Sequence, residues 1–433
     1  MQCFGSGGSG TIATTTSTST VKTTTTARPA HERIASPRIT KNIYVDAING
    51  DDENDGRNET AAFKTMQRAN TDIQDGTKVL VKNGVYRNGG FGSGRSNGPV
   101  LRISNKSDVL LTNFPGHTPV IEFDGAGGIV MSRVKRVEIS RFDIFGPNSF
   151  LTKEEALNDR TLKRDDANSN LFLGRGIVAW SGNNIYIHHN KVHHCPGSGI
   201  RSNKGDYVAI EDNIVFNNTW WTSSAESAIV IADARSIDEL DLKKFFLNHN
   251  EVFGNQNFIP FYSKKVACTR GCPGRPGYGS FTQTYIIDGS GVYVTRNKNY
   301  RYGRFDMSYN RAYLNGINGL VVHKTDRAHV VGNIIWNNGQ VSRGPPEMRQ
   351  PYAGLTLNQA DKVEVRDNMV KTETRADFSY VMHSSGGLNS GSGNNRNCKI
   401  SAADGSSKGR VSEQYGSTVK SATWVECSAV MDI

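Results

Sequence analysis

The chain has no long hydrophobic run and little cysteine. None of its apolar stretches approaches the roughly twenty residues that a membrane-spanning helix needs, and only 6 of its 433 residues are cysteine. We therefore expect no membrane partner. No second Cys or His pair lies at ligand spacing near Cys268 and Cys272, which argues against a zinc site. The first eight residues lack the basic start and apolar stretch of a signal peptide, so we expect either a fragment of a longer protein or an unusual export route.

Motifs for RNA or DNA binding and runs of stacking aromatic residues are also missing. Lysine and arginine together number 51 against 41 aspartates and glutamates, which gives a formal net charge of +10. A basic protein of this kind favours an acidic partner over a neutral one. Because no nucleic-acid motif accompanies the charge, we expect an acidic polysaccharide as the partner and no nucleic acid.

What the chain does contain is an internal repeat. Four times a glycine opens a short apolar strand and an asparagine follows fourteen positions later: Gly176 to Asn190, Gly199 to Asn213, Gly319 to Asn333 and Gly354 to Asn368. Two more copies fit if a loop is allowed inside the repeat, namely Ala228 to Asn250 and Gly291 to Asn310. Such self-similarity indicates a solenoid, in which each unit buries its apolar face by stacking on its neighbours.

Each repeat opens with a strict alternation of side chains. A period of two predicts one inward set, Ile177, Ile200, Val292, Leu320 and Leu355, and one outward set, Val178, Arg201, Tyr293, Val321 and Thr356. Stacked asparagines can pass amide hydrogen bonds along an axis, and asparagine tolerates the left-handed backbone of a tight corner. We therefore predict an all-β chain that winds as a right-handed, single-stranded parallel β-helix, with the asparagine column as a structural element.

Composition divides the chain into four predicted segments. Residues 1–40 are expected to be a disordered Thr/Ser-rich linker, 41–100 the N-terminal cap and first coil, 101–371 the β-helix catalytic domain with long loop insertions, and 372–433 a C-terminal cap. Such linkers commonly tether extracellular catalytic and binding modules. A carbohydrate-binding module lost from the N-terminal side is therefore a hypothesis.

Cysteine usage favours an oxidising compartment. Two local disulfides can be drawn, one between Cys268 and Cys272 and one between Cys398 and Cys427, while Cys195 is expected to be buried. Together with the linker, these features predict a secreted, extracellular protein. We expect it to be a monomer.

Three stretches near the start of the chain resemble a known family. Residues 43–52, 62–69 and 75–86 resemble the opening cap of pectin-lyase-like β-helix proteins, in which a strand, a short helix and a first coil end in a glycine-x-tyrosine corner. The resemblance implies the right-handed parallel β-helix fold. Its members include secreted polysaccharide lyases, some glycosidases, uronan epimerases and phage tailspikes, so the resemblance leaves the reaction open.

The outward-facing columns supply the candidate site. The predicted catalytic residues are His323 and Lys324, with Arg296 one coil earlier. A uronate lyase must neutralise the carboxylate while a base removes the proton alpha to it and the 4-linked oxygen departs. Either His323 or Lys324 could be the base, and Arg296 the carboxylate clamp or a proton donor. The predicted substrate-binding residues are Trp180, Arg201, Asn203, Lys204, Tyr293 and Asn358.

Two strands resemble parts of the chondroitinase and alginate lyase group. The strand that ends at His323 resembles the basic strand of that group, which carries an arginine where this chain has the histidine. Residues 223–231 resemble the group's acidic calcium-binding strand, although only Glu226 matches. Because hard cations take oxygen ligands, Ca²⁺ is a candidate cofactor at Glu226 with Asp233 or Asn203.

Three functions remain open from the sequence. The first is a secreted lyase that cleaves a uronate-containing polysaccharide by β-elimination. The second is a uronan epimerase or a glycoside hydrolase on the same fold, for which Glu226, Asp233 and Asp288 are the available carboxylates. The third is a non-catalytic carbohydrate-binding or adhesive β-helix.

Two further motifs have competing interpretations. His188, His189, His193 and His194 suggest a metal site, but alternation separates the members of each adjacent pair. Trp220 and Trp221 could form a platform for a sugar ring or plug a loop against the solenoid.

Overall fold

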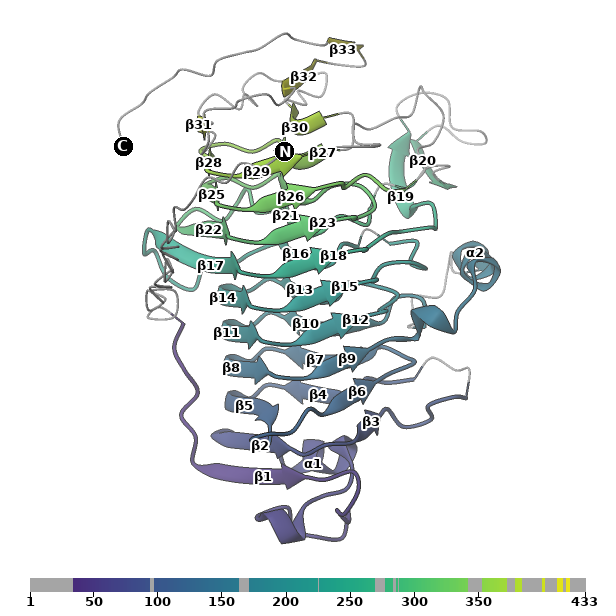
Figure 1. Ribbon diagram of the computed structural model, residues 1–433, viewed down its shortest axis with the longest axis vertical. Coiled ribbons are helices and arrows are strands. Elements are labelled where there is room, and N and C mark those ends of the chain that lie inside the picture. The colour runs from purple at the N-terminus through teal and green to yellow at the C-terminus, as the bar shows by residue number, and fades with distance from the viewer. Residues whose placement is uncertain are drawn as a thin grey trace, which may run out of the picture.

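The chain winds into a tall solenoid of three parallel sheets (Figure 1). The computed structural model describes residues 34–93, 97–162, 171–224, 226–268, 277–282, 286, 288–341, 353–371, 378–383, 399–401, 411–415 and 418–420. Each coil contributes one strand to each sheet in turn, and every pairing within the sheets is parallel except that of the last two strands of sheet 1. The predicted right-handed parallel β-helix is confirmed.

The three sheets are named by their order within a coil. Sheet 1 contains β4 (Leu101–Ser104), β7 (Gly127–Ser132), β10 (Arg175–Trp180), β13 (Ile200–Asn203), β16 (Ile229–Ala232), β21 (Val292–Thr295), β24 (Leu320–His323), β27 (Ala353–Asn358), β30 (Phe378–His383), β32 (Val411–Tyr415) and β33 (Thr418–Lys420). Sheet 2 contains β1 (Lys41–Val45), β2 (Thr77–Val81), β5 (Ser107–Asn113), β8 (Lys135–Ser140), β11 (Asn183–His188), β14 (Asp206–Glu211), β17 (Leu242–Asn248), β22 (Gly303–Ser308), β25 (Ala328–Val331), β28 (Glu364–Arg366) and β31 (Lys399–Ser401). Sheet 3 contains β3 (Val85–Arg87), β6 (Val120–Glu122), β9 (Asp143–Phe145), β12 (Lys191–His193), β15 (Ile214–Phe216), β18 (Glu251–Phe253), β23 (Arg311–Tyr313), β26 (Ile334–Trp336) and β29 (Met369–Lys371).

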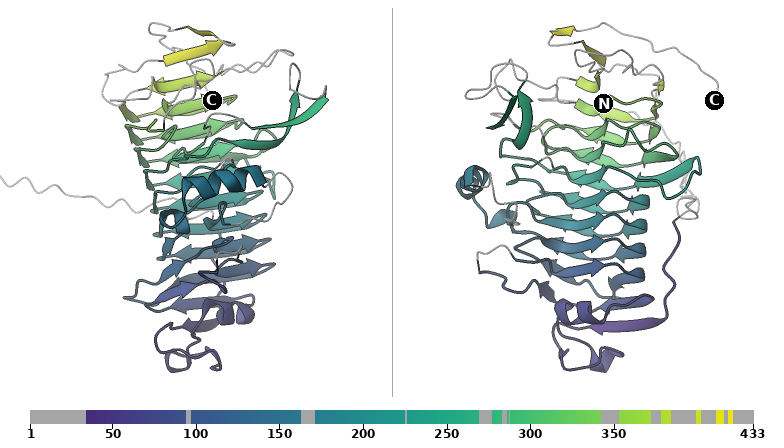
Figure 2. Two further views of the ribbon diagram at one scale, coloured as in Figure 1. Left: turned by 90° about the vertical axis from the view of Figure 1, so that its right-hand side faces the viewer. Right: turned by 180° about the vertical axis from the view of Figure 1, so that it is seen from behind.

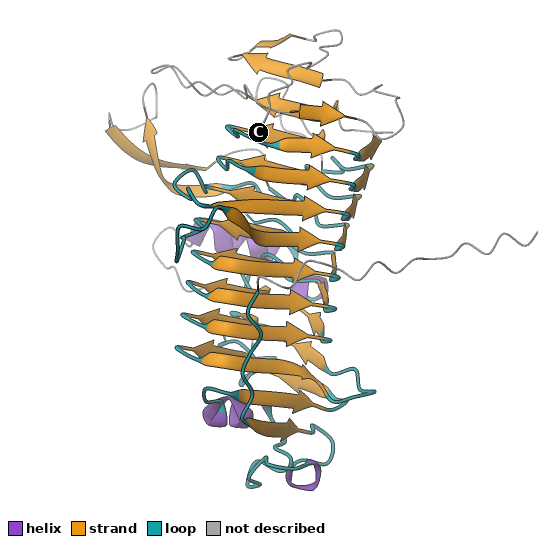
Figure 3. Ribbon diagram, turned by 90° about the vertical axis from the view of Figure 1, so that its left-hand side faces the viewer, coloured by secondary structure: helices purple, strands orange, loops and turns teal. Residues whose placement is uncertain are grey.

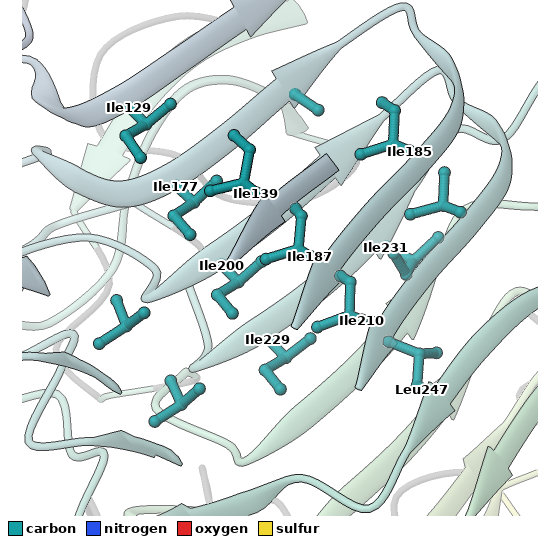
Figure 4. Close-up of a cluster of buried hydrophobic side chains, with 14 of the residues drawn as sticks. Ile129, Ile139, Ile177, Ile185, Ile187, Ile200, Ile210, Ile229, Ile231 and Leu247 are labelled. Carbon is teal, nitrogen blue, oxygen red and sulfur yellow. The ribbon is translucent and has the colours of Figure 1, made fainter. Parts of the chain in front are cut away.

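The core is a narrow column of stacked aliphatic side chains. Ile129, Ile177, Ile200 and Ile229 lie one above another on sheet 1, and isoleucines of sheet 2 face them (Figure 4). The predicted inward set is buried without exception: Ile177, Ile200, Val292, Leu320 and Leu355. Period-two alternation therefore identified the core face of sheet 1 correctly, because successive strand residues point to opposite faces.

The asparagine column is a continuous ladder of amide hydrogen bonds. Each side-chain Nδ2 donates to the Oδ1 of the next asparagine at 2.8–3.1 Å, in the order Asn190, Asn213, Asn250, Asn310, Asn333 and Asn368. All six side chains are buried. The structural interpretation of the column is confirmed.

A second ladder, which the sequence analysis missed, lies at the corner between sheets 3 and 1. It runs through Asn218, Asn255, Asn315 and Asn338, with Nδ2 to Oδ1 distances of 2.9 Å. Each member follows a first-ladder asparagine by five positions. Cys195 is buried beside Asn218, the first member of this ladder, and its backbone N–H donates to Asn218 Oδ1 at 2.9 Å.

The N-terminal cap consists of strand β1 and helix α1 (Met66–Asp72), whose buried Met66 and Ala69 close the lower end of the core. A short 3-10 turn, η2 (Glu59–Ala61), precedes α1. The seven residues 34–40, assigned to the linker by composition, instead run along the outer face of sheet 2 (Figure 3). The boundary differs because Ile34 is buried against Tyr207 and Phe246. Residues 1–33 of the predicted linker lie outside the described residues.

Insertions flank sheet 1. Helix α2 (Lys153–Leu162), preceded by the turn η3 (Pro147–Ser149), and the hairpin β19 (Tyr262–Cys268) with β20 (Gly277–Thr282) project from the corner between sheets 3 and 1 (Figure 2). The loop between β16 and β17 lies at the opposite edge of sheet 1. Most of the predicted C-terminal cap, Cys272, Cys398 and Cys427 lie outside the described residues, so both disulfides stay predictions. No helix in the described ranges is both long enough and apolar enough to cross a bilayer.

We expect Asn250→Ala to lower the free energy of unfolding by roughly 2–4 kcal/mol, because it leaves several buried amide partners unsatisfied. Asn250 donates to Ile210 O and Asn310 Oδ1 and accepts from the backbone and side chain of Asn213. Denaturant unfolding measures the change. Exposed Asn42→Ala is the control and should shift stability by less than about 0.5 kcal/mol. Equal effects of the two substitutions would contradict the role of the ladder.

Candidate active site

The outer face of sheet 1 carries most of the predicted site residues in two columns. Strand pairing aligns Val178, Arg201, Val230, Tyr293, Val321 and Thr356 in one column and Trp180, Asn203, Ala232, Thr295, His323 and Asn358 in the other. Most of these side chains are buried although they point away from the core. The side chains that retain exposure are Trp180, Tyr293, His323 and Asn358.

Two of these residues form a hydrogen-bonded pair in the middle of the face. The hydroxyl of Tyr293 on β21 lies 2.7 Å from Nδ1 of His323 on β24, and the hydroxyl of Thr295 lies 3.1 Å from the same nitrogen. Burial raises the pKa of Tyr293 well above its ordinary value, so its phenol stays protonated at neutral pH. The Tyr293–His323 pair therefore joins an imidazole to a protonated phenol.

A column of charged residues borders the face where the strands of sheet 1 end. Lys204, Asp233, Arg296 and Lys324 each have a positive φ between 46° and 58°, so the same left-handed corner recurs in successive coils. Arg296 binds Asp233 through both guanidinium branches at 3.0 and 2.7 Å. Lys204 and Lys324 are exposed beside this ion pair. The corner thus presents three positive charges and one negative charge.

A buried ionic cluster lies at the opposite edge of the face. Glu226, only 2% exposed, accepts from Arg175 at 3.2 and 2.5 Å, from Arg201 at 3.0 Å, and from the hydroxyl of Ser198. Burial alone would raise the pKa of Glu226, but the two guanidiniums and Ser198 outweigh it and lower the pKa to about 2. Arg201 also donates to Asn203 Oδ1 at 2.7 Å. We call Arg175, Ser198, Arg201 and Glu226 the arginine cluster.

A second carboxyl group, Asp288, adjoins the arginine cluster. It is 6% exposed, and its Oδ2 has no hydrogen-bond partner in the described part of the chain. Burial and the negative charge of Glu226 raise the pKa of Asp288 well above its ordinary value.

The structure places the residues that the sequence predicted for catalysis and substrate binding along one face of sheet 1 and at the ends of its strands, from β10 to β27. His323, Lys324 and Arg296 lie on or beside β21 and β24, with Tyr293 bonded to His323. Arg201 and Asn203 lie on β13, Trp180 on β10 and Asn358 on β27. These roles stay predictions. Sequence reasoning missed Arg175, Ser198 and Thr295, although Thr295 stands in the same alternating column as His323.

The predicted calcium ligands do not fit a cation as they are arranged. Both oxygens of Glu226 accept from the arginine cluster, and both oxygens of Asp233 accept from Arg296. Positively charged guanidiniums occupy the positions that a cation would need. No group of three or more His, Cys, Asp or Glu residues in the described ranges is placed to hold a metal ion. Calcium binding stays a prediction that this geometry does not favour.

Residues of the histidine and tryptophan motifs make hydrogen bonds and packing contacts within the protein. His188 and His189 contact each other through Nδ1 at 2.8 Å, and the first also meets Glu138. Trp221 packs against a buried cluster of Ala156, Phe172 and Ile259, and its indole N–H donates to Asn148 O at 2.8 Å. Trp221 thus anchors a loop to the solenoid, as the second of its two interpretations proposed.

Comparison with known proteins agrees on the fold. A family described as right handed beta helix region matches residues 61–269. Among solved structures, the A-module of the mannuronan C-5 epimerase AlgE4 from Azotobacter vinelandii is 12% identical, with 75% of this chain and 67% of that chain covered and a TM-score of 0.42. Pectate lyase Pel9A is 13% identical, with 78% of each chain covered and a TM-score of 0.41. A GH136 lacto-N-biosidase from Eubacterium ramulus is 12% identical, with 83% of this chain and 56% of that chain covered and a TM-score of 0.39.

A comparison with curated protein sequences gives no match. At these identities and TM-scores, the likeness to the solved structures carries no conclusion about the reaction.

We expect Glu226→Gln to destabilise the protein by about 3–5 kcal/mol at neutral pH, because it leaves two buried guanidiniums without their carboxylate. The folded-state pKa of Glu226 lies below its ordinary value, so its contribution is present above pH 4.5 and is lost as pH falls toward 2. Unfolding curves measured across this range should show the loss in the wild type and a flatter profile in the variant. Glu364→Gln, which alters a partly exposed ion pair on sheet 2, should cost less than about 1 kcal/mol.

Proposed function

From a chain that folds as a pectin-lyase-like right-handed parallel β-helix, we propose an enzyme that cleaves an acidic, uronate-containing polysaccharide by β-elimination. The observation that carries the proposal is the Tyr293–His323 hydrogen bond of 2.7 Å on the outer face of sheet 1, with Arg296 and Lys324 at one edge of that face and the arginine cluster at the other. An imidazole joined to a protonated phenol supplies a base and an acid at one point.

Each member of the pair has a role in this chemistry. His323 is the base, because imidazole is the side chain whose ordinary pKa lies nearest neutrality. It takes the proton alpha to the uronate carboxylate, and the electrons of that C–H bond form the new double bond. The bond to the 4-linked oxygen breaks, and Tyr293 donates its proton to the departing oxygen. The raised pKa of Tyr293 keeps its phenol protonated at neutral pH, so Tyr293 enters the reaction with a proton to donate.

Neutralisation of the substrate carboxylate falls to the cations that flank the pair. Lys324 follows His323 directly, and Arg296 lies one coil below it at the same corner. Their positive charges stabilise the enolate-like charge that develops when the proton leaves. Arg296 is held in place by Asp233, which fixes its guanidinium at the edge of the face.

The geometry favours elimination over the two catalytic alternatives. Epimerisation also begins with removal of the alpha proton, but it returns a proton to the opposite face of the sugar. Tyr293 and His323 both approach from one sheet, which suits elimination. Hydrolysis needs two carboxylates that flank one bond, whereas Glu226 is buried among its donors and Asp233 is bound by Arg296. Acidic polysaccharides of this class are extracellular polymers, so we propose an extracellular enzyme.

We expect His323→Ala to reduce the elimination rate by about a hundredfold to ten-thousandfold, the usual worth of a positioned acid–base group. The assay incubates the protein with pectate, alginate, glucuronan and chondroitin and follows the ultraviolet absorbance of the unsaturated product. Tyr293→Phe should give a similar loss while keeping the ring. His329→Ala is the matched control, because His329 pairs with Glu364 on sheet 2 and should leave the rate unchanged.

Three results would contradict the proposal. Saturated reducing ends would indicate hydrolysis, and an inverted C5 without chain cleavage would indicate epimerisation. Binding that survives in the His323 variant, with no turnover of any polymer by the wild type, would indicate a non-catalytic carbohydrate-binding protein.

Treatment with a chelator should leave the elimination rate unchanged within about twofold, because guanidinium and ammonium groups rather than a metal ion neutralise the carboxylate in this proposal. The measurement compares wild-type rates before and after chelation, with added Ca²⁺ as a further arm. A loss on chelation that Ca²⁺ restores would show that the predicted cofactor is used.

A further inference from the structure

The outer face of sheet 3 takes no part in the proposed active site, yet apolar side chains are exposed along it. Sheet 3 has nine strands, of which β15 is the central one, and it faces the viewer in Figure 1. Helix α2 and the β19–β20 hairpin project sideways from the corner of this sheet and do not cross it. Ile214, Ile334 and Met369 are exposed by 42%, 39% and 64%. Exposed apolar side chains that recur along one face mark an interaction surface.

The charges on this face are arranged symmetrically about its central strand. Strand pairing stacks the first residues of β9, β12, β15, β18 and β23 in one column, which runs Asp143, Lys191, Ile214, Glu251 and Arg311. One strand away from Ile214, a lysine on one side matches a glutamate on the other. Two strands away, an aspartate matches an arginine. All five residues keep part of their surface exposed.

The same column continues symmetrically to both ends of the sheet. Three strands from Ile214 lie Val120 on β6 and Ile334 on β26, and four strands from it lie Val85 on β3 and Met369 on β29. All four of these residues are apolar, and each keeps part of its surface exposed. Every residue of the column therefore has, equally far on the other side of Ile214, a residue of opposite charge or another apolar residue.

A column of aromatic side chains runs beside the charged one, and its rings offer no platform for a sugar. It consists of Phe145, His193, Phe216, Phe253 and Tyr313. From His193 to Tyr313 neighbouring rings are nearly parallel, with centroids 4.7 to 4.9 Å apart. Because each ring face is covered by the next ring, the edges point outward, whereas a sugar packs on a ring face. The column therefore suits the apolar surface of a protein.

We propose that sheet 3 is the interface of a homodimer, in which a second copy of this chain packs face to face about a two-fold axis along β15. This axis reverses the order of the coils but keeps the direction of the strands, so each strand meets the strand equally far from β15 in the second copy. Lys191 then meets Glu251 of the second copy, and Asp143 meets its Arg311. Ile214 lies on the axis and meets its own counterpart. Such a dimer differs from the monomer expected from the sequence.

The charges select one register of this dimer. A shift of one strand would bring Lys191 against Arg311 of the second copy, or Asp143 against its Glu251, and like charges in contact are unfavourable. Eight strand steps of about 4.8 Å and strands of three residues give a face of roughly 38 Å by 10 Å. A projected area of roughly 400 Å² for each copy is small for a specific interface, so we expect a dissociation constant in the micromolar range.

Two charge reversals and a mixture of them test the dimer in the full chain. Sedimentation velocity across the micromolar range measures association, and thermal unfolding checks that each variant folds. Lys191→Glu places like charges opposite each other at two symmetric contacts of the dimer, and Glu251→Lys does the same. Lys135→Glu is the matched control, because Lys135 is exposed on sheet 2.

We expect the wild type and Lys135→Glu to dimerise alike, and each of the two sheet 3 variants to associate with itself about tenfold more weakly. A one-to-one mixture of Lys191→Glu with Glu251→Lys restores opposite charges at both contacts, so its association should return to within about threefold of the wild type. Ile214→Arg brings two positive charges together on the axis and should abolish association by itself. It keeps the test decisive if Glu251→Lys does not fold.

Three outcomes would overturn the inference. A wild type that stays monomeric at every concentration would assign the surface to a different protein. A dimer that persists with Ile214→Arg would use another surface. Weaker association of both single variants without recovery in their mixture would reject the antiparallel register about β15.

Discussion

The stacking of identical coils by buried amide hydrogen bonds is the constraint on which the rest of the structure depends. Asn213, Asn250 and Asn310 each donate to the asparagine of the next coil and accept from the one before. A buried amide that lost one of these partners would remain unsatisfied. The ladder therefore fixes the register of the coils that it joins, from Asn190 to Asn368, and a slip of one residue there would turn the outer face of sheet 1 inward.

Fixed register turns distant sequence positions into neighbours. Tyr293 and His323 are separated by a whole coil in sequence, yet they share a 2.7 Å hydrogen bond because β21 and β24 pair in parallel. The same stacking aligns Lys204, Arg296 and Lys324 at one corner through a repeated left-handed residue. A chain molecule laid across the strands thus meets a regular series of side chains, which is the property that a polymer-binding face needs.

Most charged groups on this face are held in ion pairs, which offset the free energy that burying a charge costs. Buried ionised groups cost desolvation energy unless they are paired and hydrogen-bonded. Glu226 meets this requirement for Arg175 and Arg201, and Asp233 pairs with Arg296 beside two exposed lysines. The exposed Lys204 and Lys324 beside these pairs are the charges on which the proposed anionic glycan depends.

The sequence by itself determined the fold, the core-facing residues of sheet 1, the first asparagine ladder and the outward columns that hold His323 and Tyr293. These features follow from period-two alternation and from the glycine-to-asparagine spacing, which are local and readable. The asparagines of the second ladder are also visible in the sequence, five positions after those of the first. That spacing did not predict a ladder, because the corner between sheets 3 and 1 was not known from the sequence. Only the tertiary structure decided how charged residues pair. It placed Glu226 between two arginines and Asp233 against Arg296, whereas the sequence had suggested calcium at these carboxylates. These ion pairs join residues of different coils, and no local sequence pattern gives the distances between coils.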